Sequence, residues 1–324
     1  MIIDFHTHIF PDRLNSFLNA AEKNSLAQPW VGNVREKLVA FRKQGRSWIR
    51  PVADLLHTLQ PKTRNAPSLL RNWGDEIGSL AVLPNLLVES TVEDLEDARV
   101  ASKVDMAVII AHPPYAMNEF ILEEARKNSE LIAAVNLIKG TRDPAKVLRQ
   151  YVDQGAKLLK IHPSSDGLHA NSSHYKKLIA TAAELGLPVI IHTGCIHMSL
   201  MYQNFEASHA EEFTPWFKKF PQVQFILAHM NYHAPQIAID LMKKFQNVYV
   251  DTSWQPGEVI VQAISEAGAD RILFGSDWPL GGNNISASLK RIQQAREAGL
   301  ITVEDSKKIL GLNAAKLLGL RVEI

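Results

Sequence analysis

The sequence predicts an α/β protein: a distorted (β/α)8 barrel, or TIM barrel, with a helical insertion after its first strand. Short apolar, β-branched runs alternate with longer amphipathic segments, which is the pattern of strand–helix units on a parallel sheet. There are eight such runs, at 2–5, 106–110, 131–137, 156–161, 188–191, 223–228, 248–250 and 271–275. From the second onward they begin roughly 24 to 36 residues apart, the length of one strand, one helix and two loops. Eight such units predict a closed barrel.

The segments between the runs carry helix start and stop signals. Asp143 precedes Pro144 as an N-cap, and residues 302–305 have the pattern of a capping box. Glycines at 186, 268 and 299 stand where three helices should end. A doubly wound open sheet is the alternative fold, but it needs a glycine-rich phosphate loop after an early strand. Residues 6–11 contain no glycine, which favours the barrel.

One connection breaks the repeat, because roughly 95 residues separate the first strand from the second, far more than one helix and two loops need. We therefore expect a single domain over 1–324, with an insertion at about 10–100 that covers the barrel mouth. The stretch 46–71 within it is rich in Arg and Pro and is expected to shape substrate choice. Packing against a neighbouring subunit in a homodimer is the alternative role.

Composition narrows the range of functions. The 35 Lys and Arg residues nearly balance 34 Asp and Glu residues, for a net charge of +1, which argues against nucleic acid or an anionic membrane as a partner. The single cysteine, Cys195, cannot form an intramolecular disulfide. No apolar run approaches the roughly 20 residues that cross a bilayer. These features predict a cytoplasmic protein that acts on a small-molecule substrate.

Polar residues follow the strand runs, and in barrels of this kind catalytic groups lie at the carboxyl ends of several strands. Five of the eight are histidines, although the chain has only 12 histidines in 324 residues. A cluster of buried imidazoles without a metal or partners would be costly to desolvate. In chain order the eight are His8, His112, Asn136, His162, His192, His229, Asp251 and Asp277.

The first strand gives the sharpest metal-binding pattern. Side chains two residues apart on a strand point to the same face, so His6 and His8 can both bind one ion inside the barrel. His192 and Asp277, at the ends of later strands, complete a set of three imidazoles and one carboxylate. Such a set suits zinc as the divalent cofactor, with manganese or iron(II) as alternatives.

Together these motifs resemble the amidohydrolase superfamily, in the amidohydrolase-related branch that includes aminocarboxymuconate-semialdehyde decarboxylase-like proteins. The resemblance covers nearly the whole chain and implies a distorted (β/α)8 barrel with a divalent metal. It implies His6, His8, His192 and Asp277 as ligands, with His229 beside the metal as a proton-transfer group, and it implies no particular substrate. The motifs that carry it lie at 4–8, 155–163, 191–194, 227–229, 250–253, 274–279 and 313–315.

The residues themselves lead to a mechanism. A metal at an open site lowers the pKa of water and polarises a carbonyl, and Asp277 and His229 are the expected catalytic groups for moving the proton. The leading prediction is a hydrolase that acts on an amide, ester or lactone carbonyl. The rival is a non-oxidative decarboxylase of an unsaturated or aromatic carboxylic acid. Arg46 or Arg50 of the insertion, reaching a substrate carboxylate, would suit a decarboxylase or a lactonase.

Several further residues are expected near the substrate. In binuclear relatives a carboxylated lysine bridges two metals, and Lys160 resembles that position; a plain ammonium contacting a substrate carboxylate is the alternative. His162 and His112 are expected to face the substrate, with Trp278, and also Trp254, as walls of the pocket. Cys195 is expected to be inert, because no general base is implied beside it.

Two further classes compete with these enzymes. A metal-dependent nuclease of the same superfamily also begins with an Asp-x-His-x-His strand, but it usually has a glutamate ligand where this chain has Lys160 and His162. A non-catalytic barrel is disfavoured because every expected ligand is present.

Overall fold

Eight parallel strands form one sheet in sequential order, and this confirms the predicted barrel. The computed structural model describes residues 1–22, 28–63, 66–199, 202–280 and 284–321. The strands are short and almost entirely buried, as expected for parallel strands covered by helices. They are β1 (Ile3–Thr7), β2 (Met106–Ile110), β3 (Leu131–Asn136), β4 (Leu158–Ile161), β5 (Val189–His192), β6 (Phe225–Ala228), β7 (Val248–Asp251) and β8 (Ile272–Leu273).

The barrel closes between β1 and the segment around β8. The amide of Phe5 donates to the carbonyl of Phe274 at 2.8 Å, and that of His8 donates to Trp278 at 2.7 Å. Thr7 and Trp278 form a parallel bridge across the same seam. Because β8 is only two residues long, its side of the seam is made largely by irregular backbone that leads into the site.

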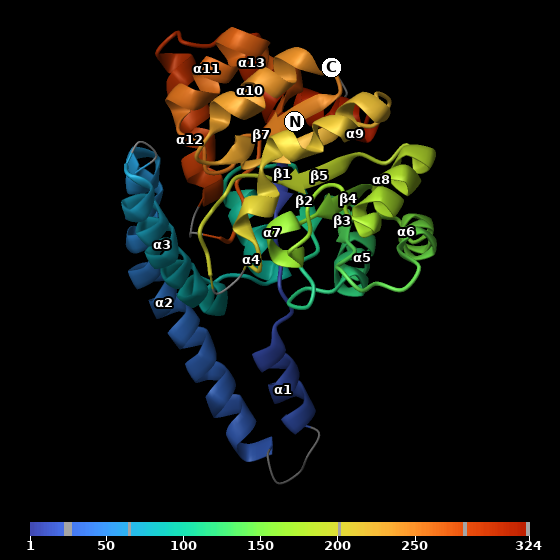
Figure 1. Ribbon diagram of the computed structural model, residues 1–324. Helices are drawn as coiled ribbons and strands as arrows, with labels where there is room; N and C mark the ends of the chain where they lie inside the picture. The colour runs from blue at the N-terminus through green and yellow to red at the C-terminus, as the bar shows by residue number, and fades with distance from the viewer. Residues whose placement is uncertain (23–27, 64–65, 200–201, 281–283, 322–324) are drawn as a thin grey trace.

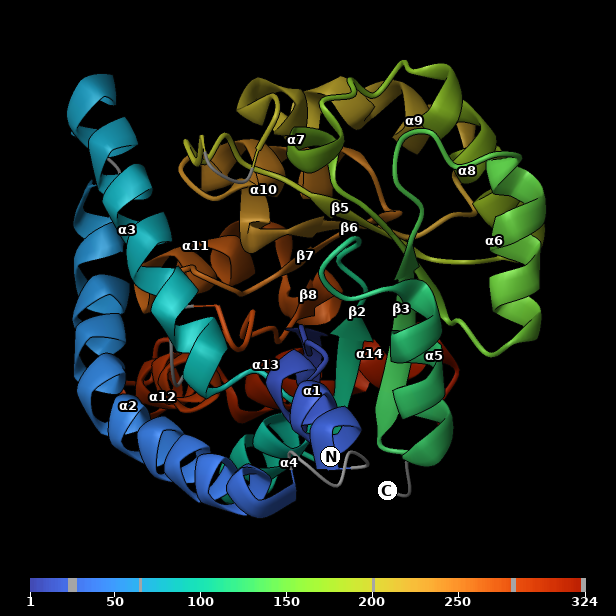
Figure 2. The same ribbon diagram turned by 90° about the horizontal axis from the view of Figure 1, so that it is seen from below.

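Helices surround the barrel on the outside (Figures 1 and 2). The expected helix N-caps are confirmed: the Asp143 side chain accepts from the Lys146 amide at 3.3 Å, and Thr302 and Asp305 form a capping box. The helices after the insertion are α5 (Asn118–Lys127), α6 (Pro144–Asp153), α7 (Pro163–Asp166), α8 (Ser173–Leu185), α9 (Thr214–Lys219), α10 (Pro235–Lys244), α11 (Gly257–Ala267), α12 (Asn284–Glu297), α13 (Val303–Lys307) and α14 (Asn313–Leu318).

The hydrophobic core has two parts, because strand side chains alternate between the two faces of the sheet. An inner cluster that includes Phe5, Ile190 and Leu273 fills the lower barrel. A larger outer cluster packs the other strand face against the helices. The inner cluster forms the floor beneath the polar residues of the mouth.

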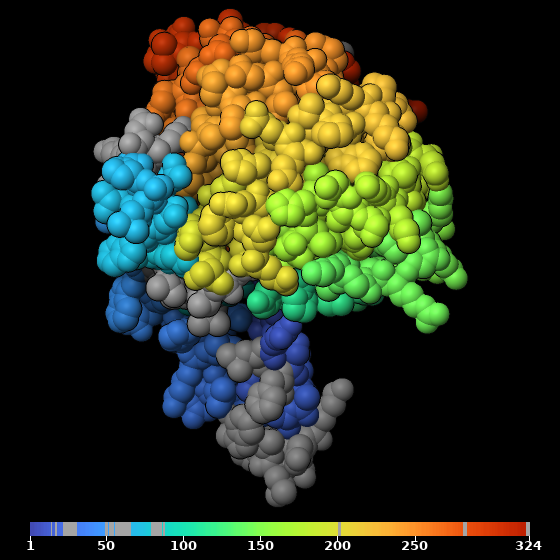
Figure 3. All heavy atoms as spheres, in the orientation of Figure 1, coloured from blue at the N-terminus to red at the C-terminus, as the bar shows by residue number. Residues whose placement is uncertain are grey.

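The long connection after β1 is helical. It forms α1 (Arg13–Glu22), α2 (Gln28–Thr63), α3 (Ser68–Val88) and α4 (Val92–Ala101). The helices α2 and α3 lie side by side along one flank, and α1 with the start of α2 projects beyond the body (Figures 1 to 3). Among the described residues, no helix has the length and apolar character needed to cross a membrane.

Candidate metal centre

The side chains that sequence analysis singled out meet at the carboxyl ends of the strands. His6 lies on β1 and His8 just after it, while Asp277 follows β8. All three are buried, with 1%, 4% and 4% of their surface exposed. Their polar atoms lie within 4.8 Å of one another, as a shared ion requires.

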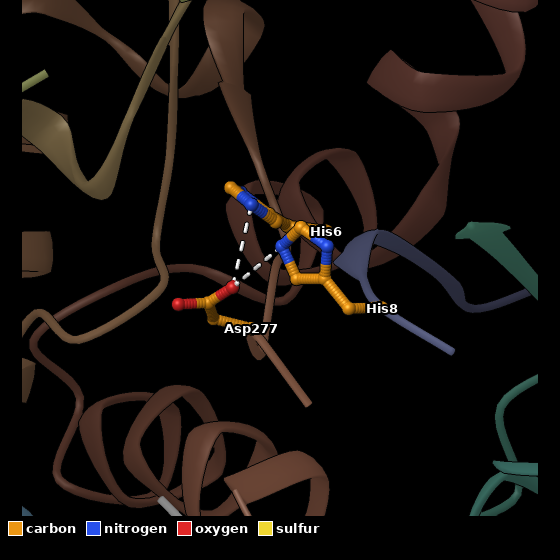
Figure 4. A group of neighbouring side chains, drawn as sticks. All are labelled: His6, His8 and Asp277. Carbon is orange, nitrogen blue, oxygen red and sulfur yellow. Dashed lines mark ion pairs between the residues drawn. The ribbon is translucent and has the colours of Figure 1, made fainter. Parts of the chain in front are cut away.

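Asp277 is the centre of this group (Figure 4). Its Oδ1 lies 3.4 Å from His6 Nε2 and 3.2 Å from His8 Nε2. Donor atoms that share one ion at about 2.0–2.2 Å are themselves separated by about 3 to 3.5 Å. The spacing of the three atoms is therefore that of neighbouring ligands around a single divalent ion.

Hydrogen bonds fix which imidazole nitrogens are free. His6 Nδ1 donates to Asp251 Oδ2 at 2.8 Å, and His8 Nδ1 donates to the carbonyl of Ile110 at 3.1 Å. Each ring then carries its lone pair on Nε2, the nitrogen that faces Asp277. An imidazole oriented by a carboxylate or carbonyl on its far side is the usual arrangement of a metal-binding histidine.

Several buried polar atoms of the centre and of His192 beside it lack a hydrogen-bond partner. His6 Nε2, Asp277 Oδ1 and His192 Nε2 are buried and have no hydrogen-bond partner. Orphaned buried polar atoms are rare and costly unless something else satisfies them. Two imidazoles and a carboxylate with free lone pairs fit a divalent metal.

His192 lies beside this group and is linked to it through a chain of hydrogen bonds. Ser253 donates to Asp251, His229 Nδ1 contacts Ser253 Oγ at 2.8 Å, and His229 Nε2 lies 3.2 Å from His192 Nδ1. Because the Ser253 hydroxyl gives its proton to the bond with Asp251, it accepts from His229 Nδ1. His229 Nε2 then carries a lone pair and accepts from His192 Nδ1. This leaves the lone pair of His192 on Nε2, its orphaned atom.

A second group, His6, His229 and Asp251, is also close enough to hold an ion. Asp251 is already engaged there, because Oδ2 accepts from His6 and Oδ1 accepts from the backbone amide of His229 at 3.0 Å. Ser253 also donates to Oδ1. A carboxylate with this many donors orients its neighbours, so the first group is the better candidate.

Burial controls the protonation of the centre. It lowers the pKa of His6, His192 and His229 below the ordinary range, so these rings are neutral at pH 7. Burial also raises the pKa of Asp277, but the surrounding imidazoles His6, His229 and His8 more than offset this, and its net pKa is lowered. His6 and His192 are therefore neutral imidazoles and Asp277 is a carboxylate, the protonation states that a metal needs.

Lys160 lies in the barrel beneath the centre. It is 1% exposed, and its Nζ has no hydrogen-bond partner. Burial lowers the pKa of its ammonium to about 8, although the charges of Asp251 and Asp277 oppose this. A lysine with this pKa has an appreciable neutral fraction near pH 7, which its reaction with carbon dioxide would require.

His162 and His112 line the mouth next to the candidate ligands. The His162 ring stacks on His192, with centroids 3.9 Å apart, and His112 lies 5.8 Å from the ring of His8. Burial lowers the pKa of His112 to about 3. Both imidazoles are thus neutral hydrogen-bonding groups at physiological pH.

Other expected site residues are placed elsewhere. Trp278 is fully buried in the outer core, between the barrel and the helices. Arg46 donates to the Val88 carbonyl and pairs with Asp94, so it ties α2 to α4 and does not reach into the mouth. The Arg50 side chain lies outside the described part of the structure.

Some residues near the centre make contacts that sequence analysis did not predict; Trp254, expected as a wall of the pocket, is one of them. Trp254 donates from Nε1 to Asp277 Oδ2 at 2.6 Å. Asp4 accepts from the amides of His6 and Ser276, at 3.2 and 3.0 Å, and so links β1 to the segment after β8. Tyr202, in the loop after β5, lies against His162. Asp4 and Trp254 stand within or beside strand-end motifs, whereas no sequence signal marks Tyr202.

Backbone strain is concentrated at the same place. Eight described non-glycine residues have a positive φ, a conformation that side chains disfavour. Six of them follow β6, β7 or β8 at the mouth, where such strain is often part of a functional site. They are His229, Met230, Asn231, Tyr232, Trp254 and Asp277.

A parallel barrel with imidazoles and carboxylates gathered at its carboxyl edge is the architecture of a metal-dependent barrel enzyme. A family model described as Amidohydrolase matches residues 3–320. The chain therefore belongs to the amidohydrolase family, as the sequence motifs predicted. No curated protein matches the sequence.

Solved structures with the same barrel include enzymes of different activities, and at these identities the likeness shows the fold. One is 5-carboxyvanillate decarboxylase LigW from Sphingomonas paucimobilis (13% identity, TM-score 0.62, 99% of each chain covered). Another is a probable 2-pyrone-4,6-dicarboxylic acid hydrolase from Acinetobacter baumannii (15%, 0.55, 72% of this chain and 90% of that chain). A third is a 5-carboxyvanillate decarboxylase from Novosphingobium aromaticivorans complexed with manganese (16%, 0.58, 84% and 93%).

Proposed function

We propose that the protein is a metal-dependent hydrolase that directs water at an amide, ester or lactone carbonyl of a small molecule. The observation that carries this proposal is the group of His6, His8 and Asp277, whose spacing and orphaned atoms fit one divalent ion. His192, with its free Nε2, is the fourth ligand in the proposal. Zinc suits this set, and manganese is supported by the manganese-bound decarboxylase that shares the fold.

A divalent ion held there would polarise the substrate carbonyl and lower the pKa of water. The chain's own residues then move the proton. Asp277, a carboxylate at neutral pH, accepts the proton from water and returns it to the leaving group. His229 is neutral and lies with its Nδ1 4.0 Å from Asp277 Oδ2, so it can orient the water or share the proton. Trp254 holds Asp277 in place through its indole N–H.

Non-oxidative decarboxylation of an unsaturated or aromatic acid is the second candidate. It is supported by the decarboxylases among the similar folds and by Lys160, an unpartnered cation beneath the centre that suits a carboxylate. In this reaction the bond from the ring or chain carbon to the departing carboxylate breaks, and that carbon takes a proton. Asp277, ionised at neutral pH, would first accept this proton from water and then pass it on, with His229 as the alternative proton carrier. The two candidates use the same residues and differ in the bond that breaks.

An assay of two substrate sets separates the candidates. Protein loaded with manganese or zinc is given lactones, including 2-pyrone-4,6-dicarboxylate, and separately aromatic diacids, including 5-carboxyvanillate. Ring opening without release of carbon dioxide supports the hydrolase, whereas carbon dioxide release with no lactone turnover replaces it with the decarboxylase. Asp277→Asn should abolish either activity, and Asp270→Asn, an exposed aspartate, is the matched control.

The metal itself is tested by its content per chain, measured by plasma mass spectrometry on protein purified without chelator. About one equivalent, lost in Asp277→Asn and retained in Asp270→Asn, supports the four-ligand site. About two equivalents would assign Lys160 as a carboxylated bridge between two ions. No metal, even after reconstitution, would contradict both candidate reactions.

A further inference from the structure

The loop after β5, described at 193–199 and 202–204, is fastened to the insertion by two neighbouring carboxylates of α3. Asp75 accepts from the backbone amide of His197 at 3.0 Å. Glu76 accepts from the amide of Ser199 at 2.8 Å and contacts His197 Nδ1 at 3.0 Å. Three contacts therefore hold the first half of the loop to α3.

Asp75 also binds the loop after β6. Both of its carboxylate oxygens lie 3.0 Å from His233 Nε2, so the His233 side chain is a partner of the insertion. Asp75 is 3% exposed, while Trp73 and Ile77 on the same helix are 69% and 45% exposed. Asp75 therefore faces the body of the protein, while Trp73 and Ile77 face solvent. Figure 3 shows the described part of α3 next to the segment that follows β5.

The second half of the loop is fastened to α7. The carbonyl of Ser164 accepts from the amides of Gln203 and Asn204, at 2.9 and 3.1 Å. Tyr202 precedes this anchor, and its own amide donates to the Met198 carbonyl at 2.9 Å. The loop is therefore attached on both sides of Tyr202, to α3 of the insertion before it and to Ser164 of α7 after it.

The Tyr202 side chain lies over the candidate metal centre. Its ring centroid is 5.2 Å from His162 and 5.4 Å from His192. A tyrosine phenol has an ordinary pKa of about 10, so the Tyr202 hydroxyl keeps its proton at neutral pH. No side-chain hydrogen bond among the described residues uses its hydroxyl. A neutral phenol can donate to an oxygen on a molecule bound at the centre.

We propose that Tyr202 is a substrate-contacting residue that donates a hydrogen bond to a carbonyl or carboxylate oxygen of the substrate. We further propose that Asp75 is a positioning residue, which keeps Tyr202 over the centre by holding the loop to α3. The first part rests on the proposed function, since it needs a substrate at the metal centre. The second part concerns the protein alone and does not depend on any activity.

The positioning role is tested by amide hydrogen exchange, read by mass spectrometry on the full chain without added metal. Asp75→Asn removes the charge that pairs with His233, so exchange in peptides covering 197–204 should rise at least tenfold. Peptides from α5, on the other side of the barrel, should be unchanged. His233→Asn should reproduce the effect from the barrel side, and Asp240→Asn, an exposed aspartate of α10, should have none. Unchanged exchange at 197–204 in Asp75→Asn would overturn the positioning role.

The substrate contact is tested by steady-state kinetics on whichever compound the wild-type protein turns over. Tyr202→Phe should lower kcat/KM about 10- to 100-fold with metal content and melting temperature unchanged. Tyr151→Phe is the control, because its hydroxyl donates to Glu119 on the surface of the protein. The kcat/KM of the double variant Asp75→Asn/Tyr202→Phe should equal that of Tyr202→Phe alone, because both substitutions disrupt the same contact between Tyr202 and the substrate. Wild-type kinetics in Tyr202→Phe would refute the contact, whereas inactive wild-type protein would count against the proposed function.

An independent observation concerns the outer surface of α2. Four large apolar residues, Val34, Phe41, Trp48 and Leu55, are spaced seven residues apart and are 37%, 57%, 70% and 56% exposed. A seven-residue spacing keeps side chains on one face of a helix, as in the seam of a coiled coil. The helix runs along the flank of the molecule and projects beyond its body, so the line is accessible to another helix (Figures 1 and 2).

The four positions are symmetric about their midpoint, and this points to a second copy of the same chain. Two α2 helices packed antiparallel around a twofold axis would bring Phe41 of one copy opposite Trp48 of the other, with Val34 opposite Leu55. An isologous interface needs such a self-complementary surface. We therefore propose that the line on α2 forms a homodimer, which is the alternative role that the sequence left open for the insertion.

Light scattering coupled to size-exclusion chromatography tests the dimer on the full chain. The wild-type protein should elute with twice the mass of one chain, and the Phe41→Ser/Trp48→Ser variant with a single mass and an unchanged circular dichroism spectrum. Trp73→Ser removes an equally exposed tryptophan from α3, off the line, and should leave the dimer intact. A monomeric wild-type protein, or a dimer that survives the double substitution, would refute the interface.

Discussion

Asp251 orients the candidate ligands without facing the ion. It accepts from His6 Nδ1, from the amide of His229 and from Ser253, so one carboxylate fixes the tautomers on both sides of the centre. Asp251→Asn should weaken metal affinity by about 10- to 100-fold, because an amide cannot hold His6 in the same way. The dissociation constant for zinc, measured by competition with a chromophoric chelator, checks this. An affinity equal to that of Asp270→Asn would contradict the orienting role.

The reactivity of the Cys195 thiol should depend strongly on pH. Burial, with the charges of Glu206 and Glu212, raises the pKa of its thiol from 9.0 to about 11. Since only the thiolate is alkylated, the rate with iodoacetamide at pH 8 should be about 100-fold lower in the folded protein than in urea. The folded rate should then rise about tenfold per pH unit until pH 11. A rapid reaction at pH 8 would mean that the thiol is activated after all.

At the residue scale, sequence predicted which candidate ligands lie close together, but not all of the contacts around them. His6, His8 and Asp277 could be found because strand alternation and strand ends determine where their side chains point. Trp278 could not be placed in the same way, because strand β8 ends early and irregular backbone turns the indole into the outer core. Tyr202 and Asp75 were not found, since their position depends on a loop and a helix that meet only in the folded structure.

At the element scale, the loops after β5 and β6 pack so closely that only glycine fits between them. Gly194 has a φ of +103°, and a Cβ there would collide with the Cβ of Tyr232 and lie 3.0 Å from the backbone of Asn231. Gly194→Ala should therefore cost several kcal/mol, beyond the roughly 1 kcal/mol of a strained conformation alone. It should also displace the loop that carries Tyr202.

Gly155→Ala is the matched control, because Gly155 has a φ of +110° and nothing lies within 4 Å of the place that a Cβ would take there. Urea unfolding of both variants gives the two free energies of unfolding. The difference between them isolates the steric clash from the backbone strain that they share. Equal losses would mean that the two loops can move apart without penalty.

Strands and helix ends could be predicted from sequence wherever residues close together in the chain determine them. The strand positions and the caps at Asp143 and Thr302 follow from periodicity and side-chain chemistry, and the structure confirms them. The course of the insertion does not follow from such rules. It depends on contacts between distant residues, such as Arg46 with Asp94 and Asp75 with His233, which no local pattern encodes.

At the scale of the whole molecule, the candidate metal centre lies across the seam where the barrel closes. His6 and His8 belong to β1 and its end, and Asp277 belongs to the segment after β8. The amide of Asp277 donates to the carbonyl of His6 at 2.7 Å, one of the few backbone bonds that join the two sides. An ion bound by these side chains would therefore connect the first and last strands of the barrel.

Metal binding should for this reason stabilise the whole fold. A ligand that binds only the folded state adds about 2.7 kcal/mol at a concentration 100 times its dissociation constant, which should raise the melting temperature by several degrees. Calorimetry of chelator-treated protein with and without zinc or manganese measures this shift, and Asp277→Asn should show none. Hydrogen exchange adds a local readout: metal should slow the amides of Phe5, His8 and Asp277 more than those between β3 and β4. Uniform slowing, or none, would mean that the ion does not bridge the seam.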